Sequence, residues 1–284
     1  MTPGRKIKDF TAKALIWFCA LLTTGILAAL IVYIMVRGMP NISWDFLTGP
    51  YMPGKDDQSG IFNMIVTTVY IIGMTLLIAA PIGVFAAIYL TEYACPGRFV
   101  NLVRFTTESL SGIPSIIFGL FGFMFFGMLL GLRYSLLTGA LTLSLTVLPT
   151  IIRATEEAVK AVPEPYREGS LALGASKLYT LFKIVLPSAF PGILTSLILS
   201  VGRIVGETAA VLFTAGIVYR LPGSIMDSGR TLAVHLYVLS TEGSTMAQIA
   251  QSDATAAVLV ALVLLINIAS NIIGSAFGKK VRES

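Results

Sequence analysis

Residues 61–90, IFNMIVTTVYIIGMTLLIAAPIGVFAAIYL, form a stretch of thirty residues without a charged side chain. An α-helix crosses the hydrocarbon core of a bilayer in about 20 apolar residues, so this stretch is long enough to span and to tilt or kink at Pro81. Its apolar residues are continuous and do not alternate with polar ones, which favours a helix over a barrel strand. The stretch predicts a membrane-spanning helix.

The composition of the whole chain agrees with this local pattern. Of its 284 residues, 55% are hydrophobic and only 12% are charged, whereas a soluble domain is about 25% charged. So few charges cannot cover a water-exposed surface of this size, which excludes a soluble enzyme and a disordered protein. We expect residues 1–284 to form a single membrane domain.

Five further stretches have the length and the apolar character of a span, and one of them carries two charges. The predicted spans lie near residues 14–36, 61–90, 109–132, 134–152, 187–219 and 254–278. The sequence therefore predicts an all-α polytopic membrane protein with six transmembrane helices.

The basic residues outside the spans predict the orientation. One side of the membrane receives Arg5, Lys6, Lys8, Lys13, Arg98, Arg104, Arg153, Lys160, Arg167, Lys177, Lys183, Lys279, Lys280 and Arg282. The other side receives Arg37, Lys55, Arg133, Arg220 and Arg230. Because cytoplasmic loops carry the excess of Lys and Arg, both termini are expected in the cytoplasm, together with the long loop 153–187.

Metal sites and catalytic sites are not indicated. Cys19 and Cys95 are far apart and the only histidine is His235, so neither a metal site nor a disulfide is predicted. We expect His235 at the surface of an outer loop. The chain has no G-x-x-x-x-G-K-[ST] phosphate loop and no catalytic residues are assigned, so it is not expected to be an enzyme or to hydrolyse ATP itself.

The loop 153–187 has its own helical pattern. Residues 155–162 read as a short charged helix that ends at Pro163. Pro165 opens a second helix of good helix formers, and Pro187 is where we expect the chain to turn into the membrane.

The second part of this loop carries a resemblance. Glu168-Gly169-Ser170 is followed by three residues and Gly174, and nine residues later by Ile184-Val185-Leu186-Pro187. This spacing is that of the "EAA" loop in the permease subunits of bacterial ABC importers, with Gly169 and Ser170 in place of two alanines. The resemblance implies a type I importer (MetI-like) permease fold and a coupling helix that docks on a separate ATPase subunit. The coupling residues that it implies are Glu168, Gly169, Ser170, Gly174, Ile184, Leu186 and Pro187.

Two charges lie inside the fifth predicted span. Arg203 and Glu207 are four residues apart, so on a continuous helix they share one face and can pair. Each charge costs about 2.5–3.5 kcal/mol at the bilayer centre, which excludes lipid exposure of both. The charges alone leave two interpretations open: a structural ion pair, or a substrate pathway in which Arg203 binds an anion through its guanidinium fork.

A second resemblance favours the pathway. The run G-R-x-x-G-E-T at residues 202–208 is similar to the permease subunits of phosphate-specific ABC importers of the PstA type, as are residues 108–119, 167–176 and 232–237. It implies that Arg203 takes part in phosphate passage, with Glu207 as its counter-charge, in a bacterial plasma (inner) membrane.

The same resemblance implies the partners. They are a PstC-like permease, a PstB-like ATPase dimer and a PstS-like phosphate-binding protein, with phosphate as the substrate and no nucleic acid. ATP and Mg belong to the ATPase, so no cofactor is expected in this chain. Two alternatives stay open: a permease for another oxyanion, such as sulfate or molybdate, and a stand-alone secondary carrier.

Overall fold

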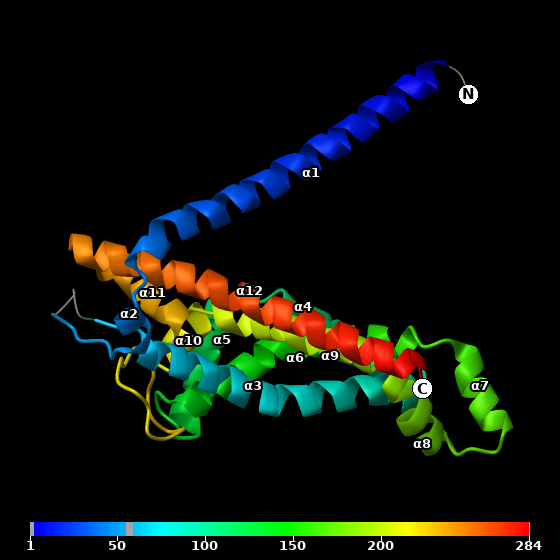
Figure 1. The fold of residues 1–284 in the computed structure, drawn as a ribbon. Coiled ribbons are helices and arrows are strands. Elements are labelled where there is room, and N and C mark those ends of the chain that lie inside the picture. Colours follow the sequence, from blue (N-terminus) through cyan, green and yellow to red (C-terminus); the bar gives the residue numbers. More distant parts are fainter. Residues whose placement is uncertain (1–2, 55–58, 284) are drawn as a thin grey trace.

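The computed structural model describes residues 3–54 and 59–283, and within them every regular element is helical (Figure 1). In this described part of the chain, five helices are long and apolar enough to cross a membrane: Phe10–Asn41, Phe62–Tyr93, Leu136–Lys160, Lys177–Gly206 and Met246–Ala269. The bent pair Arg98–Ser111 and Ser115–Leu129 makes a sixth if it is counted as one span. The predicted all-α membrane architecture is thus confirmed. Lys55, which entered the orientation count, lies outside the described residues.

The core of the bundle lies between α3 (Phe62–Ile88), α6 (Leu136–Lys160) and α9 (Leu186–Gly206). Its buried apolar residues are Ile71, Ala79, Leu136, Leu143, Val147, Ile151, Ile204, Ala210, Val211, Ala215 and Val234. The α3 and α6 backbones approach closely, because a Cβ added at Gly83 would lie 2.7 Å from a methyl group of Ile151. Such small residues are what helix contacts in membranes require.

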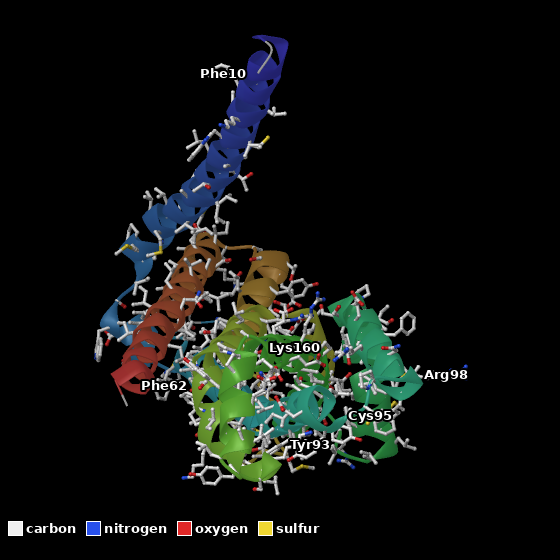
Figure 2. The ribbon with its side chains drawn as sticks, turned by 90° about the vertical axis from the view of Figure 1, so that its right-hand side faces the viewer. Phe10, Phe62, Tyr93, Cys95, Arg98 and Lys160 are labelled. Carbon is white, nitrogen blue, oxygen red and sulfur yellow. The ribbon has the colours of Figure 1, made fainter. Side chains whose placement is uncertain are left out.

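The first helix, α1 (Pro3–Gly38), begins away from the bundle and touches it only near its C-terminal end (Figure 1). Arg37 Nε lies 3.3 Å from Asp253 Oδ2 of α12 (Met246–Glu283), and a Cβ at Gly38 would clash with the backbone oxygen of Asp253. Figure 2 shows Phe10 at the far end of α1, away from the other helices. No part of the apolar window of α1 is buried within the chain.

The third predicted span, 109–132, is broken rather than continuous. The helix α4 (Arg98–Ser111) ends at Gly112, and α5 (Ser115–Gly122) continues into a π-helical turn, η4 (Phe123–Leu129), at an angle of 103° to α4. Pro114 explains the break, since it has no N–H to donate and disfavours helical backbone at the residue before it. The helix therefore begins well before the predicted span.

The fourth predicted span, 134–152, and the short charged helix expected after it form one helix, α6. Its charged end is supported by i,i+4 pairs: Arg153 Nε lies 3.4 Å from Glu157 Oε1, and Lys160 Nζ lies 2.9 Å from Glu156 Oε2. The loop predicted to begin at residue 153 therefore begins after Lys160.

The fifth predicted span, 187–219, is corrected at both ends. The spanning helix already begins with α8 (Lys177–Thr180) and a π-helical turn, η5 (Leu181–Val185), so the chain does not turn at Pro187, which lies in the first turn of α9. At its other end α9 stops at Gly206. The short helix α10 (Ala209–Thr214) follows, and α11 (Leu232–Glu242) packs beyond it.

Candidate functional site

The segment that follows α6 carries the helix α7 (Glu164–Ala172), which lies at one end of the bundle beside α8 (Figure 1). Pro163 precedes it and Pro165 occupies its first turn, where a missing N–H costs nothing. Gly174, with φ +85°, ends it: its N–H donates to Leu171 O at 3.0 Å, and the N–H of Ala175 donates to Ser170 O at 3.2 Å. This is a Schellman cap, so the structure gives Gly174 the turning role expected of it.

The two small residues after Glu168 differ in burial. Ser170 is buried, and its Oγ lies 2.8 Å from Thr180 Oγ1 of α8. Gly169 is exposed, and a Cβ added there would meet no atom within 4 Å. Nothing in this chain therefore prevents a side chain at Gly169. Ser170, in contrast, holds α7 against α8.

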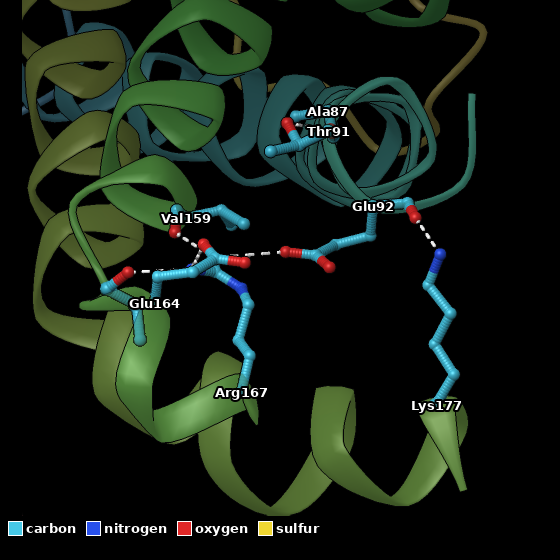
Figure 3. Close-up of polar contacts among 8 residues, drawn as sticks. Ala87, Thr91, Glu92, Val159, Glu164, Arg167 and Lys177 are labelled. Carbon is cyan, nitrogen blue, oxygen red and sulfur yellow. Dashed lines mark hydrogen bonds and ion pairs between the residues drawn. The ribbon is translucent and has the colours of Figure 1, made fainter. Parts of the chain in front are cut away.

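Arg167 fastens α7 to the ends of two spans (Figure 3). Its guanidinium donates to Val159 O and Val162 O, both at 2.7 Å, where α6 ends. It also donates to Glu92 Oε1 at 3.2 Å; Glu92 lies in η3 (Tyr89–Tyr93), the π-helical turn that ends α3. Both side chains are only 13% exposed.

A second basic residue reaches the same point. Lys177 Nζ donates to the backbone oxygen of Glu92 and lies 4.8 Å from the ring centre of Tyr93. Neither Glu92 nor Arg167 was assigned a site role from the sequence. The available signal was that Glu92 is the first charge after the apolar stretch 61–90, and such a charge at a span end invites a basic partner.

The outward side of the α7 segment is exposed and partly apolar. Glu168 has no ion pair within the described residues and is exposed, as is Tyr166 beside it. Leu173 is 91% exposed, and Tyr179 and Phe182 are each more than half exposed. Of the remaining predicted coupling residues, Ile184 and Leu186 are half-buried and Pro187 is exposed. Leu186 packs on the apolar cluster that joins the ends of α3, α6 and η5.

Arg203 lies near the end of α9 with an exposed side chain. Its single hydrogen bond among the described residues is long: Nη1 donates to Thr150 Oγ1 of α6 at 3.5 Å. On either side of Arg203, a Cβ added at Gly202 or Gly206 would meet no atom within 4 Å. The Arg203 face of α9 is therefore uncovered by this chain.

The predicted pairing of Arg203 with Glu207 is not formed. Because α9 ends at Gly206, Glu207 has extended backbone, with ψ 117°, and leaves the helical face that the spacing assumed. Its Oε1 instead accepts the N–H of Ala210 at 3.5 Å, at the start of α10. Within the described residues the two side chains form no ion pair, so Arg203 has no anionic partner there.

A polar cleft of about 590 Å³ lies between α4 and α6. Glu156, only 8% exposed, is held there by Arg104 at 3.2 Å and Lys160 at 2.9 Å. Thr150 lines the cleft and is also the residue that Arg203 contacts. The sequence reading missed this cleft because the break at Gly112–Pro114 brings α4 against α6.

At the opposite end of the bundle, His235 is fully buried in α11, which corrects its expected place at the surface. Arg230 Nη1 lies 3.3 Å from His235 Nδ1, and Arg230 Nε donates to Ile217 O at 2.9 Å. Burial, and then the charge of Arg230, lower the pKa of His235 from 6.5 to about 3. His235 is therefore neutral at physiological pH.

Comparison with known proteins places these elements in one family. Residues 79–283 match the family described as "Binding-protein-dependent transport system inner membrane component". That range includes α7, the Arg203 face and the polar cleft.

Two relatives show the extent of the similarity. The chain is 36% identical to the probable ABC transporter permease protein YqgI of Bacillus subtilis, over 98% of this chain and 99% of the relative. It is also 36% identical to the phosphate transport system permease protein PstA of Haemophilus influenzae, over 71% of this chain and 67% of the relative.

Solved structures show the same fold. An inward-facing structure of the MetNI methionine ABC transporter matches with a TM-score of 0.59 at 23% identity, over 77% of this chain and 94% of that chain. A bacterial alginate ABC transporter in complex with its periplasmic protein matches with a TM-score of 0.64 at 14% identity, over 96% of this chain and 95% of that chain. The predicted type I importer permease fold is thereby confirmed.

These matches leave no place for the alternative of a stand-alone carrier, and they confirm that the chain is a membrane subunit rather than an enzyme. The chain is a multi-pass inner membrane protein and belongs to the family of inner membrane components of binding-protein-dependent ABC transport systems.

Proposed function

We propose that this chain forms half of the translocation pathway of an ATP-driven phosphate importer. The observation that carries this proposal is Arg203, an exposed cation on a spanning helix whose own chain supplies only one contact, at 3.5 Å. Such a charge is too costly to face lipid, so it faces a water-filled path or another subunit. The likeness to permeases named for phosphate transport favours phosphate as the anion.

The other half of the pathway comes from a second permease of the PstC type. The uncovered stripe at Gly202 and Gly206 allows a helix of that subunit to approach α9 closely. Arg203 then lies between the two permeases, where its planar fork can donate two parallel hydrogen bonds to phosphate oxygens. Glu207 lies near enough along the chain to lower the anion affinity again, so that phosphate is released.

The ATPase dimer, of the PstB type, docks on α7. The outer face of this helix carries the exposed side chain of Glu168 and the backbone of Gly169. No packing within this chain requires a glycine at position 169. A flat helix face beside exposed apolar side chains suits insertion into a cleft of a partner. ATP and Mg are held by that partner, and ATP-driven closure of the ATPase pair moves α7.

In this proposal both termini and α7 lie in the cytoplasm, which the distribution of basic residues supports. A phosphate-binding protein of the PstS type then delivers phosphate at the opposite end, near α2 (Trp44–Thr48) and α11. Alternating access moves phosphate from that end past Arg203 to the cytoplasm.

The experiment is uptake of radiolabelled phosphate by a host that lacks only this chain, with the chain restored as wild type or as Arg203→Gln. Loss of the guanidinium removes charge-assisted hydrogen bonds of about 1.5–3 kcal/mol, so uptake is expected to fall about 10- to 100-fold while the complex still assembles. Arg98→Gln is the control, because it also removes one positive charge but lies at an exposed position outside the cleft and the Arg203 face (Figure 2).

Competition with unlabelled anions identifies the substrate. Phosphate should suppress uptake, and sulfate or molybdate should leave it unchanged. Wild-type uptake that does not depend on the chain rules out phosphate import, and normal uptake by Arg203→Gln rules out the role of Arg203.

A further inference from the structure

The helix α7 has almost no apolar attachment to the rest of the chain. Ser170 is its only buried residue, and the buried apolar cluster at this end is built from α3, α6, η5 and α9 without it. A nine-residue helix is not stable alone in water. The position of α7 therefore depends on polar contacts.

Arg167 supplies most of these contacts. One guanidinium group reaches Val159 O in the last turn of α6, Val162 O just beyond α6, and the carboxylate of Glu92 in η3, all within 3.2 Å. Val159 and Val162 are buried in the apolar cluster. Val159 O also accepts the N–H of Val162 at 3.3 Å, so Arg167 adds a second donor there, as basic side chains near a helix end do.

The bonded residues lie on the spans that carry the proposed pathway. Val159 is nine residues beyond Thr150 on α6, about 14 Å along the helix axis, and Thr150 is the contact of Arg203. α3 is packed against α6 throughout the core. A displacement of α7 that is carried by Arg167 thus reaches α6, which holds the Thr150 contact of Arg203, and α3, which packs against α6.

We propose that Arg167 is the positioning residue of the coupling step: by holding α7, the end of α6 and the end of α3 together, it makes the three move as one body. This inference rests on the proposed function for the direction of the motion. It assigns Arg167 a role distinct from docking, because its side chain points toward Val159 and Glu92 (Figure 3), whereas Glu168 and Gly169 are exposed.

The test uses the full complex with its ATPase and binding protein in proteoliposomes. Bound ATPase, ATP hydrolysis and phosphate uptake are measured for wild type, Arg167→Gln and Lys183→Gln. Lys183 is an exposed basic residue of the same segment, with no ion pair in the described part of the chain. We expect Arg167→Gln to keep the ATPase and its hydrolysis, while phosphate moved per ATP falls about tenfold. Lys183→Gln should match wild type.

The ratio of phosphate moved to ATP hydrolysed separates a positioning role from a loss of folded complex, because a shortage of folded complex lowers uptake and hydrolysis together. Glu92→Gln weakens only the link to α3, so it should lower the phosphate moved per ATP about threefold. It decides the question if the Arg167→Gln permease does not fold, and if that variant does fold, the double variant should be no worse than Arg167→Gln alone. A wild-type ratio in an assembled variant, or loss of the ATPase from a folded Arg167→Gln permease, overturns the proposal.

A second measurement does not depend on the substrate. Spin labels are placed at Leu77 on α3 and Leu171 on α7, both at least 49% exposed, after exposed Cys19 and Cys95 are replaced by serine. The Leu77–Leu171 distance should stay constant when a non-hydrolysable ATP analogue binds, and should change in Arg167→Gln. A constant distance in Arg167→Gln contradicts the proposal. Absence of phosphate uptake by wild type would contradict the proposed function. The Leu77–Leu171 distance would still test the role of Arg167.

Discussion

Arg167 and Arg203 lie in opposite environments of the same chain. The Arg167 side chain is 13% exposed, and its guanidinium donates to Val159 O, Val162 O and Glu92, as well as to exposed Glu164. Arg203 is exposed and contacts only Thr150, at 3.5 Å. Because a guanidinium carries five N–H donors, the first arginine is nearly satisfied by its own protein, whereas the second has most of its donors unused.

The difference separates two uses of an arginine in a transporter. A satisfied guanidinium fixes the relative position of helices, because every acceptor that it holds would be left unpaired if it moved. An unsatisfied guanidinium can bind an anion that comes and goes, because the anion supplies acceptors that the protein lacks. Loss of Arg167 should therefore lower stability strongly and loss of Arg203 should hardly change it, whereas phosphate transport should fall in both variants.

The largest stability effect is expected at Arg167. Arg167→Gln removes the guanidinium donors from Val159 O, Val162 O and Glu92, which should lower the unfolding free energy by about 3 kcal/mol. Arg203→Gln removes one long contact and should change it by less than about 0.5 kcal/mol. Thermal unfolding of the purified permease complex measures both. Equal losses in the two variants would break the comparison, since Arg203 would then also be a structural residue.

The sequence alone predicts the membrane architecture because the signal for it lies in continuous apolar stretches such as residues 61–90. It also predicts the helix α7, from Pro165 and Gly174. It misses the break at Pro114 and the end of α9 at Gly206, because an apolar composition continues across both. Because the sequence does not show that α9 ends at Gly206, the i,i+4 spacing of Arg203 and Glu207 wrongly indicates an ion pair.

The Arg167–Glu92 contact illustrates a different limit. The two residues are 75 positions apart, and their pairing exists only because α3 and α6 pack side by side. Charge patterning within a helix predicts neighbours at three or four residues, such as Lys160 and Glu156, but it holds no information on which loops meet. The sequence therefore indicates Arg167 only as a basic residue of the loop 153–187.

A third arginine sharpens the comparison, because Arg230 is buried like Arg167 but holds a neutral histidine. His235 Nδ1 accepts from Arg230 only while the ring is uncharged. The pKa of His235 is about 3 in the folded state against 6.5 when unfolded, so below pH 6.5 the unfolded state binds more protons. Stability therefore falls as the pH drops from 6.5 toward 3, by about 2 kcal/mol between pH 7 and pH 5.

Thermal unfolding at pH 7 and pH 5 tests this, with His235→Asn as the variant that keeps a polar side chain but cannot titrate. The variant should lose less stability than wild type on acidification. The same pH dependence in both would show that other groups carry it and that the Arg230–His235 contact is not fixed in one protonation state.

The smallest effects separate the two neighbours on α7. Ser170→Ala removes the hydrogen bond to Thr180 and should cost about 1 kcal/mol of stability without loss of the ATPase. A Cβ at Gly169 would meet no atom of this chain within 4 Å, so Gly169→Leu should not lower stability. Its side chain should cover the outer face of α7 and reduce ATPase co-purification. Gly169→Ala is the control, because a methyl group should alter docking little. If Gly169→Leu retains the ATPase fully, the outer face of α7 is not the docking face, and the division between an inward anchoring side and an outward docking side fails.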